Sequence, residues 1–354
     1  MLRSCRTRAS DNHRPELLLT SPVSSSIPTR QALTSSAVWH PADITSTREW
    51  AIDLTDDQRG EIVTATRRAA AGGAIAADLR RDDFALAAMQ PAFEAWSAAL
   101  GSGLGFLLLR GFPVDLLDPG EIEMAYVGFG MHFGRPVGQN AAADLLTHIR
   151  DERLAESGPT VRLYRTRKRQ DFHTDAADLV GLLCLHRAAS GGESRIASSA
   201  AIYNEILRRR PDLLEVLYEP MCWDRNGEES VGEAPFFSLA PLHDVDGVPR
   251  VFYVGWYIRD AQRHADAPRL TGAQIEAMDL LESIANDPAF HIEMDFRPGD
   301  IQLLNNARIL HAREAYEDHA DPAQRRHLLR LWLAADRFAS LEAPLREGIA
   351  RQQR

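Results

Sequence analysis

The sequence predicts an α+β fold with a double-stranded β-helix, or jelly roll, at its core and with helices that flank it and are inserted into it. Helical apolar spacing dominates the first hundred residues after Trp50, whereas short strand-like runs dominate the second half. Glycine, aspartate and proline separate those runs. Many short strands with long inserted connections favour two stacked sheets over the strand–helix alternation of a parallel α/β sheet.

The predicted helices are segments in which apolar residues recur at spacings of three and four. Thr55 precedes the first of them, and proline at 211 divides the fourth. The segments are 56–65, 84–100, 119–133, 199–217 and 271–286.

The predicted strands are short apolar runs that end at turn residues. The turns between them include Gly191–Gly192, Asp244–Gly247 and Pro298–Asp300. The runs are 105–112, 161–164, 179–186, 251–258, 290–296, 301–305 and 327–334.

Three segments are expected along the 354-residue chain. Residues 1–45 are rich in Ser, Thr, Arg and Pro and have no sustained apolar period, so we predict a disordered tail. Residues 46–340 are expected to form a single jelly-roll domain whose N-terminal part is helical. Residues 341–354 are expected to form a C-terminal tail.

Composition excludes several functional classes. The chain carries 40 basic and 50 acidic side chains, and a formal net charge of -10 disfavours nonspecific binding to nucleic acid. Its apolar runs are much shorter than the roughly 20 residues that a membrane-spanning helix needs. Cys5, Cys184 and Cys222 are too widely spaced for a disulfide framework, so a reducing cytoplasm is the expected location.

Pairs of histidine and acidic residues are the first candidates for chemistry. In an extended His-x-Asp segment, both side chains point to the same face of the strand. One distant histidine would complete a facial triad, which suits non-haem Fe(II) because other coordination positions stay open. The candidate pairs are His173/Asp175, His264/Asp266, His319/Asp321 and the acidic variant His291/Glu293.

Sequence context separates these pairs. His173 and Asp175 directly precede the apolar run 179–185, which can hold ligands rigidly. His264 lies in a polar, proline-bounded stretch and His319 in a charged connection, so both are expected to face solvent.

His311 is the preferred third ligand, because it follows the turn at 298–300 and the strand after it and can return across a barrel. For any single histidine, a hydrogen-bonded structural role is the competing interpretation.

The final strand places Arg326, Leu328, Arg330 and Trp332 on one face, because side chains alternate. The two guanidinium groups would start roughly 13 Å apart at the backbone. If that face lines a barrel interior, the charges need anionic partners, which a dicarboxylate co-substrate and an anionic substrate would provide. An exposed edge strand with solvated arginines is the alternative.

Together and in this order, the motifs resemble the TauD/TfdA family of Fe(II)- and 2-oxoglutarate-dependent dioxygenases, which includes clavaminate-synthase-like enzymes. The resemblance covers about residues 100–335. Its motifs are Phe172–Asp175, Ser190–Ser194, Arg297–Asn306, His311 and Arg325–Arg330.

The resemblance implies the roles of the site residues. His173, Asp175 and His311 are then the catalytic iron ligands. Arg326 and Ser194 contact the distal carboxylate of 2-oxoglutarate, and Arg330 contacts the substrate.

The cofactors that the resemblance implies are Fe(II), 2-oxoglutarate and O2. The implied reaction converts 2-oxoglutarate to succinate and CO2 and most simply hydroxylates a small molecule. Because Asp175 is retained, halogenation is not expected.

Two further patterns bear on the substrate. Arg162, Arg165, Arg167, Lys168 and Arg169 form either a solvated basic face or an entrance that attracts an anionic substrate. Tyr253, Trp256 and Tyr257 are interpreted as a buried strand rather than as an aromatic cage for a cation.

Other functions stay open at the level of the sequence. One is a cupin-like metal enzyme that does not use 2-oxoglutarate, and another is a non-catalytic jelly roll that binds a small molecule. The expected partner is a small-molecule substrate, with anionic groups as an option and with nucleic acid and membranes excluded. A homo-oligomer is compatible with the sequence.

Overall fold

A computed structural model describes residues 30–140, 142–153, 162–229, 231–245 and 247–338. The main compact unit begins at Ala32, whereas the sequence placed this boundary at residue 46. The chain packs this early because Trp39 is 1% exposed and its indole N–H donates to the carbonyl of Leu104 at 3.0 Å. The rest of the predicted N-terminal tail and the predicted tail 341–354 lie outside the described residues.

The larger of the two main sheets has the strand order β1 (Ala51–Asp53), β2 (Phe106–Arg110), β14 (Ile301–Asn305), β6 (Leu179–His186), β17 (His327–Ala334) and β3 (Arg135–Pro136). A further strand, β4 (Leu146–Ile149), also pairs with β17. The sheet is antiparallel except for the parallel pairing of β1 with β2.

The smaller sheet is antiparallel throughout. Its order is β13 (His291–Met294), β8 (Ser194–Ser198), β15 (Ile309–Arg313) and β5 (Gln170–His173). Three two-stranded ribbons complete the β structure of the described residues. They pair β9 (Met221–Asp224) with β10 (Phe236–Leu239), β11 (Leu242–Val245) with β12 (Val248–Val251), and β7 (Ser190–Gly191) with β16 (Tyr316–Glu317).

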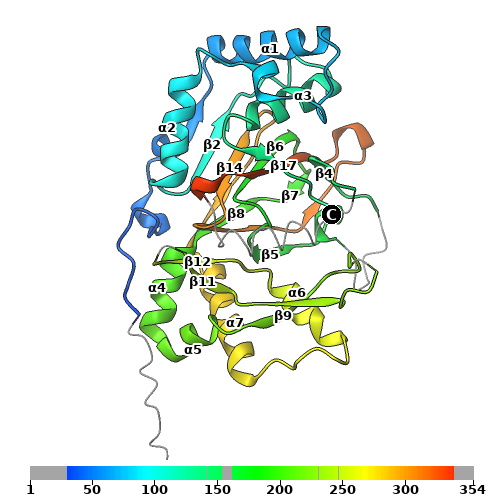
Figure 1. Cartoon of the computed structure of the whole chain (residues 1–354). Coiled ribbons are helices and arrows are strands. Elements are labelled where there is room, and N and C mark those ends of the chain that lie inside the picture. Colours follow the sequence, from blue (N-terminus) through cyan, green and yellow to red (C-terminus); the bar gives the residue numbers. More distant parts are fainter. Residues whose placement is uncertain (1–29, 141, 154–161, 230, 246, 339–354) are drawn as a thin grey trace, which may run out of the picture. The chain divides into compact units, whose positions relative to one another are not determined.

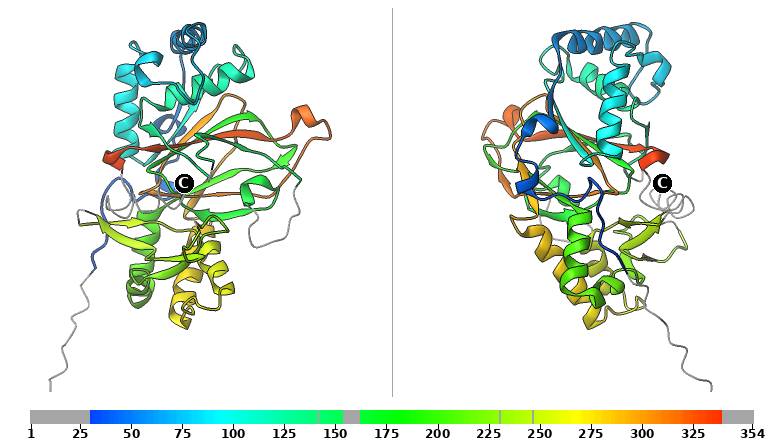
Figure 2. Two further views of the ribbon diagram at one scale, coloured as in Figure 1. Left: turned by 45° about the vertical axis from the view of Figure 1, so that its right-hand side comes forward. Right: turned by 90° about the vertical axis from the view of Figure 1, so that its left-hand side faces the viewer.

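Helices cover the outer faces of both main sheets. In Figure 1, α1 (Asp56–Ala71), α2 (Gln90–Gly101) and α3 (Pro119–Gly130) lie on one side, beyond the larger sheet. α4 (Ser199–Arg209), α5 (Pro211–Val216) and α7 (Gly272–Asn286) lie on the other side, with α6 (Gly255–Asp260), and the two views in Figure 2 keep this order. The arrangement confirms the predicted jelly-roll core with flanking and inserted helices.

Local sequence explains where the long helices begin. Thr55, Asp118 and Thr271 each accept a hydrogen bond from a backbone N–H of the first helical turn. The backbone N–H of each of these residues also donates to a Glu or Gln side-chain oxygen three residues later, as a capping box requires. No helix in the described ranges combines the length and the apolar character that a membrane crossing demands.

Apolar side chains fill the space between the two main sheets. Phe106 and Leu304 of the larger sheet belong to the same buried cluster as Ile196 and Ile309 of the smaller sheet. Each of these four side chains is at most 1% exposed. This packing holds the two sheets face to face. Side chains of the larger sheet can therefore contact side chains of the smaller sheet at the end of the cluster.

Two predicted strands are wrong. Residues 163–165 form a 3₁₀ turn, which the Thr166 hydroxyl closes by donating to the Leu163 carbonyl. In the run 251–258, the strand ends at Val251 and a helix begins at Gly255. Val254, Ile258 and Ala261 are buried at spacings of four and three, which is a helical period that a short apolar run does not distinguish from a strand.

His327, at the start of β17, makes stability depend on pH. Its Nε2 lies 2.8 Å from Nδ1 of His148, and burial, with the neighbouring charges, lowers the pKa of His327 to about 4. The unfolded chain therefore binds a proton that the folded chain does not between about pH 6.5 and 4, so stability falls as the pH drops through this window, by about 3 kcal/mol at most.

The His327→Gln variant is therefore expected to flatten the dependence of Tm on pH between about pH 6.5 and 4. His319→Gln, in the connection before β17, is the control and should keep the wild-type slope. Equal slopes for wild type and His327→Gln would contradict the prediction.

Candidate metal centre

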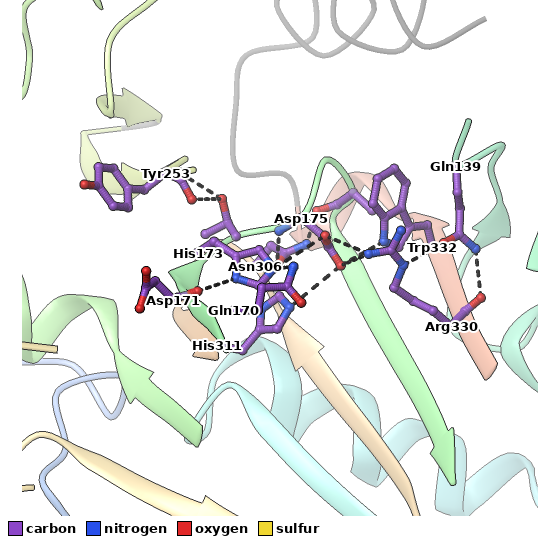
Figure 3. A network of polar contacts seen from close by, with 12 residues as sticks. Gln139, Gln170, Asp171, His173, Asp175, Tyr253, Asn306, His311, Arg330 and Trp332 are labelled. Carbon is purple, nitrogen blue, oxygen red and sulfur yellow. Dashed lines mark hydrogen bonds and ion pairs between the residues drawn. The ribbon is translucent and has the colours of Figure 1, made fainter. Parts of the chain in front are cut away.

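Backbone pairing brings together the histidines that the sequence selected. His173 ends β5 and lies directly opposite His311 of β15, and a register shift follows between His311 and Arg313. The two imidazole centroids are 4.1 Å apart. With Asp175, two residues further along the chain, they form a group whose potential ligand atoms all lie within 4.8 Å of one another. Figure 3 shows the three side chains converging on one point.

Hydrogen bonds orient the first part of this triad. Nδ1 of His173 lies 2.8 Å from the carbonyl of Asp171, to which it can donate, so Nε2 keeps its lone pair for a metal. The backbone N–H of Asp175 donates to Oδ1 of Asn306 at 3.3 Å. The Asp175 carboxylate then lies 3.9 Å from Nε2 of His173 and 3.8 Å from Nε2 of His311.

The larger sheet supplies two donors to the same carboxylate. Nη1 of Arg330 lies 3.2 and 3.3 Å from the two oxygens of Asp175, and the indole N–H of Trp332 donates to Oδ2 at 3.0 Å. Gln139 accepts from Nε of Arg330 at 2.8 Å and donates to the Arg330 carbonyl at 2.8 Å. The sequence therefore predicted correctly that Arg330 and Trp332 share a face, but gave no sign of Gln139.

The electrostatics give the triad the protonation states that a metal requires. Burial, together with the neighbouring His173 and Arg330, lowers the pKa of His311 to about 3, and burial also lowers the pKa of His173. Burial alone would raise the pKa of Asp175, but Arg330 and the two imidazoles bring it below its ordinary value. Two neutral imidazoles and one carboxylate are the donor set of non-haem Fe(II) sites, so the residues fit that ion.

Arg326 directly precedes β17 of the larger sheet, and Ser194 begins β8 of the smaller sheet. Both side chains are buried. Arg326 is 4% exposed, stacks on Tyr316 at 5.1 Å and places Nη2 3.5 Å from the carbonyl of Gly192. Its Nη1 is buried and has no hydrogen-bond partner in the described part of the chain. Ser194, 4% exposed, donates to Gln302 at 3.1 Å. A buried guanidinium with a spare donor fits a carboxylate ligand such as 2-oxoglutarate.

The other histidine–acid pairs do not form comparable clusters. His264 binds Asp224 at 2.9 Å instead of Asp266. Asp321 caps a short 3₁₀ turn through the backbone N–H of Ala323, and His319 lies half-buried beside it. For the fourth pair, the ring of His291 contacts the Ala285 carbonyl at 3.0 Å, and Glu293 pairs with Arg195 at 2.6 Å.

A cavity opens beside His173 and Asp175. Trp256 lines it and meets the His173 ring edge-on, with centroids 4.9 Å apart, and Tyr257 also lines it. The sequence interpretation of Trp256 as part of a buried strand was therefore wrong, because α6 turns the side chain toward the metal centre.

Of the predicted basic segment, Arg162 alone lines this cavity. Arg165 pairs with Glu152, and Arg167 lies 3.0 Å from Glu317. Arg169 lies 3.1 Å from Asp171. Neighbouring acidic side chains therefore compensate the charges of these three arginines.

Sequence comparison identifies relatives along most of the chain. A sequence model of the family described as taurine catabolism dioxygenase TauD, TfdA family matches residues 67–332. An FR-33289 synthase of Streptomyces rubellomurinus is 33% identical over 86% of this chain and 91% of its own length. The taurine hydroxylase-like protein SAT17 of Stachybotrys chartarum is 30% identical over 87% of this chain and 81% of its own.

Structural comparison supports the same fold. An asparagine oxygenase in complex with Fe(II), 3-hydroxyasparagine and succinate matches with a TM-score of 0.61, covering 80% of this chain and 93% of that one at 15% identity. With the extent of the family match, these findings show that the chain belongs to the TauD, TfdA family and is an Fe(II)- and 2-oxoglutarate-dependent dioxygenase.

Proposed function

We propose that this dioxygenase hydroxylates a small organic molecule that carries an anionic group, and that His173, Asp175 and His311 hold its iron. The observation that carries the assignment is the meeting of these three side chains, with neutral imidazoles and an ionised carboxylate, beside a cavity. The metal and co-substrate supply the reduction of O2 coupled to conversion of 2-oxoglutarate to succinate and CO2.

The remaining residues of the centre act by holding and orienting groups. Asn306 accepts from the backbone N–H of Asp175. Arg330 and Trp332 donate to the oxygens of its carboxylate. Fixed ligands cost little reorganisation when a metal binds. Arg330 also lines the cavity, so we assign it a substrate contact close to the metal.

Arg326 and Ser194 are our candidates for the distal carboxylate of 2-oxoglutarate. A cupin-like enzyme that does not use this co-substrate has no need of a guanidinium buried to 4% exposure with an unpartnered N–H. The burial of that charge is costly unless an anion joins it. The same observation counts against a jelly roll that only binds a substrate.

An anionic substrate is supported by the cations of the cavity and by the names of the relatives. Three arginines line the cavity, namely Arg162, Arg225 and Arg330. The family description and the fungal relative both name taurine, whose sulfonate is anionic at neutral pH. A cytoplasmic location and a homo-oligomer remain predictions.

The assignment is tested by spectroscopy and turnover. Under nitrogen, Fe(II) and 2-oxoglutarate together should give a weak metal-to-ligand charge-transfer band with the purified protein. After oxygen is admitted, succinate should form, and a substrate should accelerate it. An iron-loaded protein that shows neither the band nor binding of 2-oxoglutarate would overturn the proposal.

Trp332 gives a specific prediction about metal affinity. In Trp332→Phe, Asp175 loses the indole donor at 3.0 Å but keeps Arg330, so Fe(II) or Mn(II) should bind about 10- to 100-fold more weakly. Metal titration of the protein without oxygen measures this. Trp256→Phe is the matched control, because the Trp256 ring packs on His173 without a hydrogen bond to Asp175. Equal affinities in the two variants would contradict the role of Trp332.

A further inference from the structure

The cavity beside the triad has a charged wall that the metal centre does not use. Arg162, Arg225 and Arg330 line it, together with the carboxylates of Asp175, Asp224 and Glu228. The partners that these six groups already have within the protein determine which charge on a substrate the cavity can bind. The inference below concerns the substrate of the same site and therefore rests on the proposed function.

Two of the three arginines already have carboxylate partners in the cavity wall. Arg162 forms an ion pair with Glu228 and donates to the hydroxyl of Tyr257. Arg330 lies 3.2 Å from Asp175. Their charges are therefore largely compensated before a substrate enters.

Asp224, the third carboxylate of the wall, also has partners within the protein. Asp224 is 1% exposed and pairs with Arg263 at 2.8 Å, with His264 2.9 Å away. Its Oδ1 also accepts from the backbone N–H of Asn226 at 2.6 Å. Although Asp224 immediately precedes Arg225 in the chain, it does not neutralise that residue.

Arg225 thus lacks an ion-pair partner among the described residues, although its side chain is held in place. Its Nε donates to the Ala234 carbonyl at 2.9 Å, and its guanidinium lies 5.3 Å over the ring of Phe237. Nη1 is buried and has no hydrogen-bond partner in the ranges that the structure describes. A fixed, buried and uncompensated donor is costly unless a ligand accepts from it.

Aromatic rings make up much of the remaining wall. Tyr164, Phe237, Trp256 and Tyr257 line the cavity, and each is only partly buried. Trp223 stacks on Phe237, with centroids 6.0 Å apart and planes inclined by 20°. Such rings favour a flat, unsaturated or otherwise apolar body, whose burial against them is favourable.

We propose that Arg225 anchors the anionic group of the substrate, and that the substrate body is a flat, apolar or aromatic moiety packed among these rings. The anion is a phosphate, phosphonate, sulfonate or carboxylate, since each accepts from a guanidinium in the same way. The anchor keeps the body of the substrate in the cavity that His173 and Asp175 line.

Binding of phenyl phosphate, benzenesulfonate and benzyl alcohol tests this anchor. The protein is titrated under nitrogen with Fe(II) and saturating 2-oxoglutarate, so that the co-substrate site is filled. Quenching of tryptophan fluorescence reports binding, because Trp223, Trp256 and Trp332 line the cavity. We expect the anionic probes to bind about tenfold or more tightly than benzyl alcohol.

The variant Arg225→Gln should lose this preference, by about tenfold or more for the anions, while benzyl alcohol binds as before. Arg225→Lys keeps the charge and should retain part of the preference, which guards against an effect of misfolding. Arg208→Gln, at an exposed helix position paired with Glu205, is the control and should match wild type.

Two results would overturn the anchor: equal affinities for benzyl alcohol and the anions in wild type, or an unchanged preference in Arg225→Gln. The titration involves no turnover. A protein that binds the probes through Arg225 but forms no succinate would support the anchor and refute the dioxygenase assignment. A protein that forms succinate but binds the probes without Arg225 would support the dioxygenase assignment and refute the anchor.

Discussion

The His311→Ala variant is expected to form succinate at least about a thousandfold more slowly than wild type and to lose bound iron on dialysis. A facial triad has three protein ligands, and His311 supplies the one that comes from a distant strand. Without it, His173 and Asp175 remain two residues apart on one segment and offer only two donors. Succinate production and iron content per chain measure the effect.

The matched control is His319→Ala. His319 belongs to another His-x-Asp pair, but it lies in a surface connection, away from any cluster of ligand atoms among the described residues. It should keep wild-type activity and iron content. Full activity in His311→Ala with stoichiometric iron would show that the metal is held elsewhere.

The second large effect is expected for Arg326→Gln, in which the KM for 2-oxoglutarate should rise about a hundredfold. Hydrogen bonds to charged groups contribute about 1.5–3 kcal/mol each, and Arg326 brings both a charge and a spare N–H. Steady-state rates at saturating substrate give this KM. The kcat at saturating 2-oxoglutarate should change much less, because the iron ligands are untouched.

A thermal measurement separates this role from a structural one. Without ligand, Arg326→Gln should be at least as stable as wild type, since a buried guanidinium without a carboxylate partner is costly. Addition of 2-oxoglutarate and metal should raise the Tm of the wild type but not that of the variant. The neighbouring Arg325→Gln is the control and should behave as wild type. A normal KM in Arg326→Gln would exclude the residue from the co-substrate site.

The sequence was most informative where local rules determine structure. Alternation along an extended segment suffices to place His173 with Asp175 and Arg330 with Trp332. The turn at 298–300 and the strand after it suffice to suggest that His311 returns to the same place. The first two relations involve residues close together in sequence, and the third involves a distant strand; the structure confirms the geometry of all three.

Contacts between distant segments were not predictable in the same way. The sequence predicted a substrate contact for Arg330, which stays a prediction, but it did not indicate that the guanidinium also contacts Asp175 and Gln139. Trp256 was misjudged because an eight-residue apolar run fits a strand and a helix equally well. Arg225 drew no attention, since its role depends on Asp224 being paired elsewhere.

The pairing of His173 with His311 across two neighbouring strands also bears on biosynthesis. His311 is synthesised after the other two ligands, and it reaches its partner only after β15 has docked beside β5. The complete ligand set therefore forms only after this docking. Arg330 and Trp332 contact the carboxylate of Asp175 from the other sheet, so we expect a chelator to remove the ion without unfolding the chain.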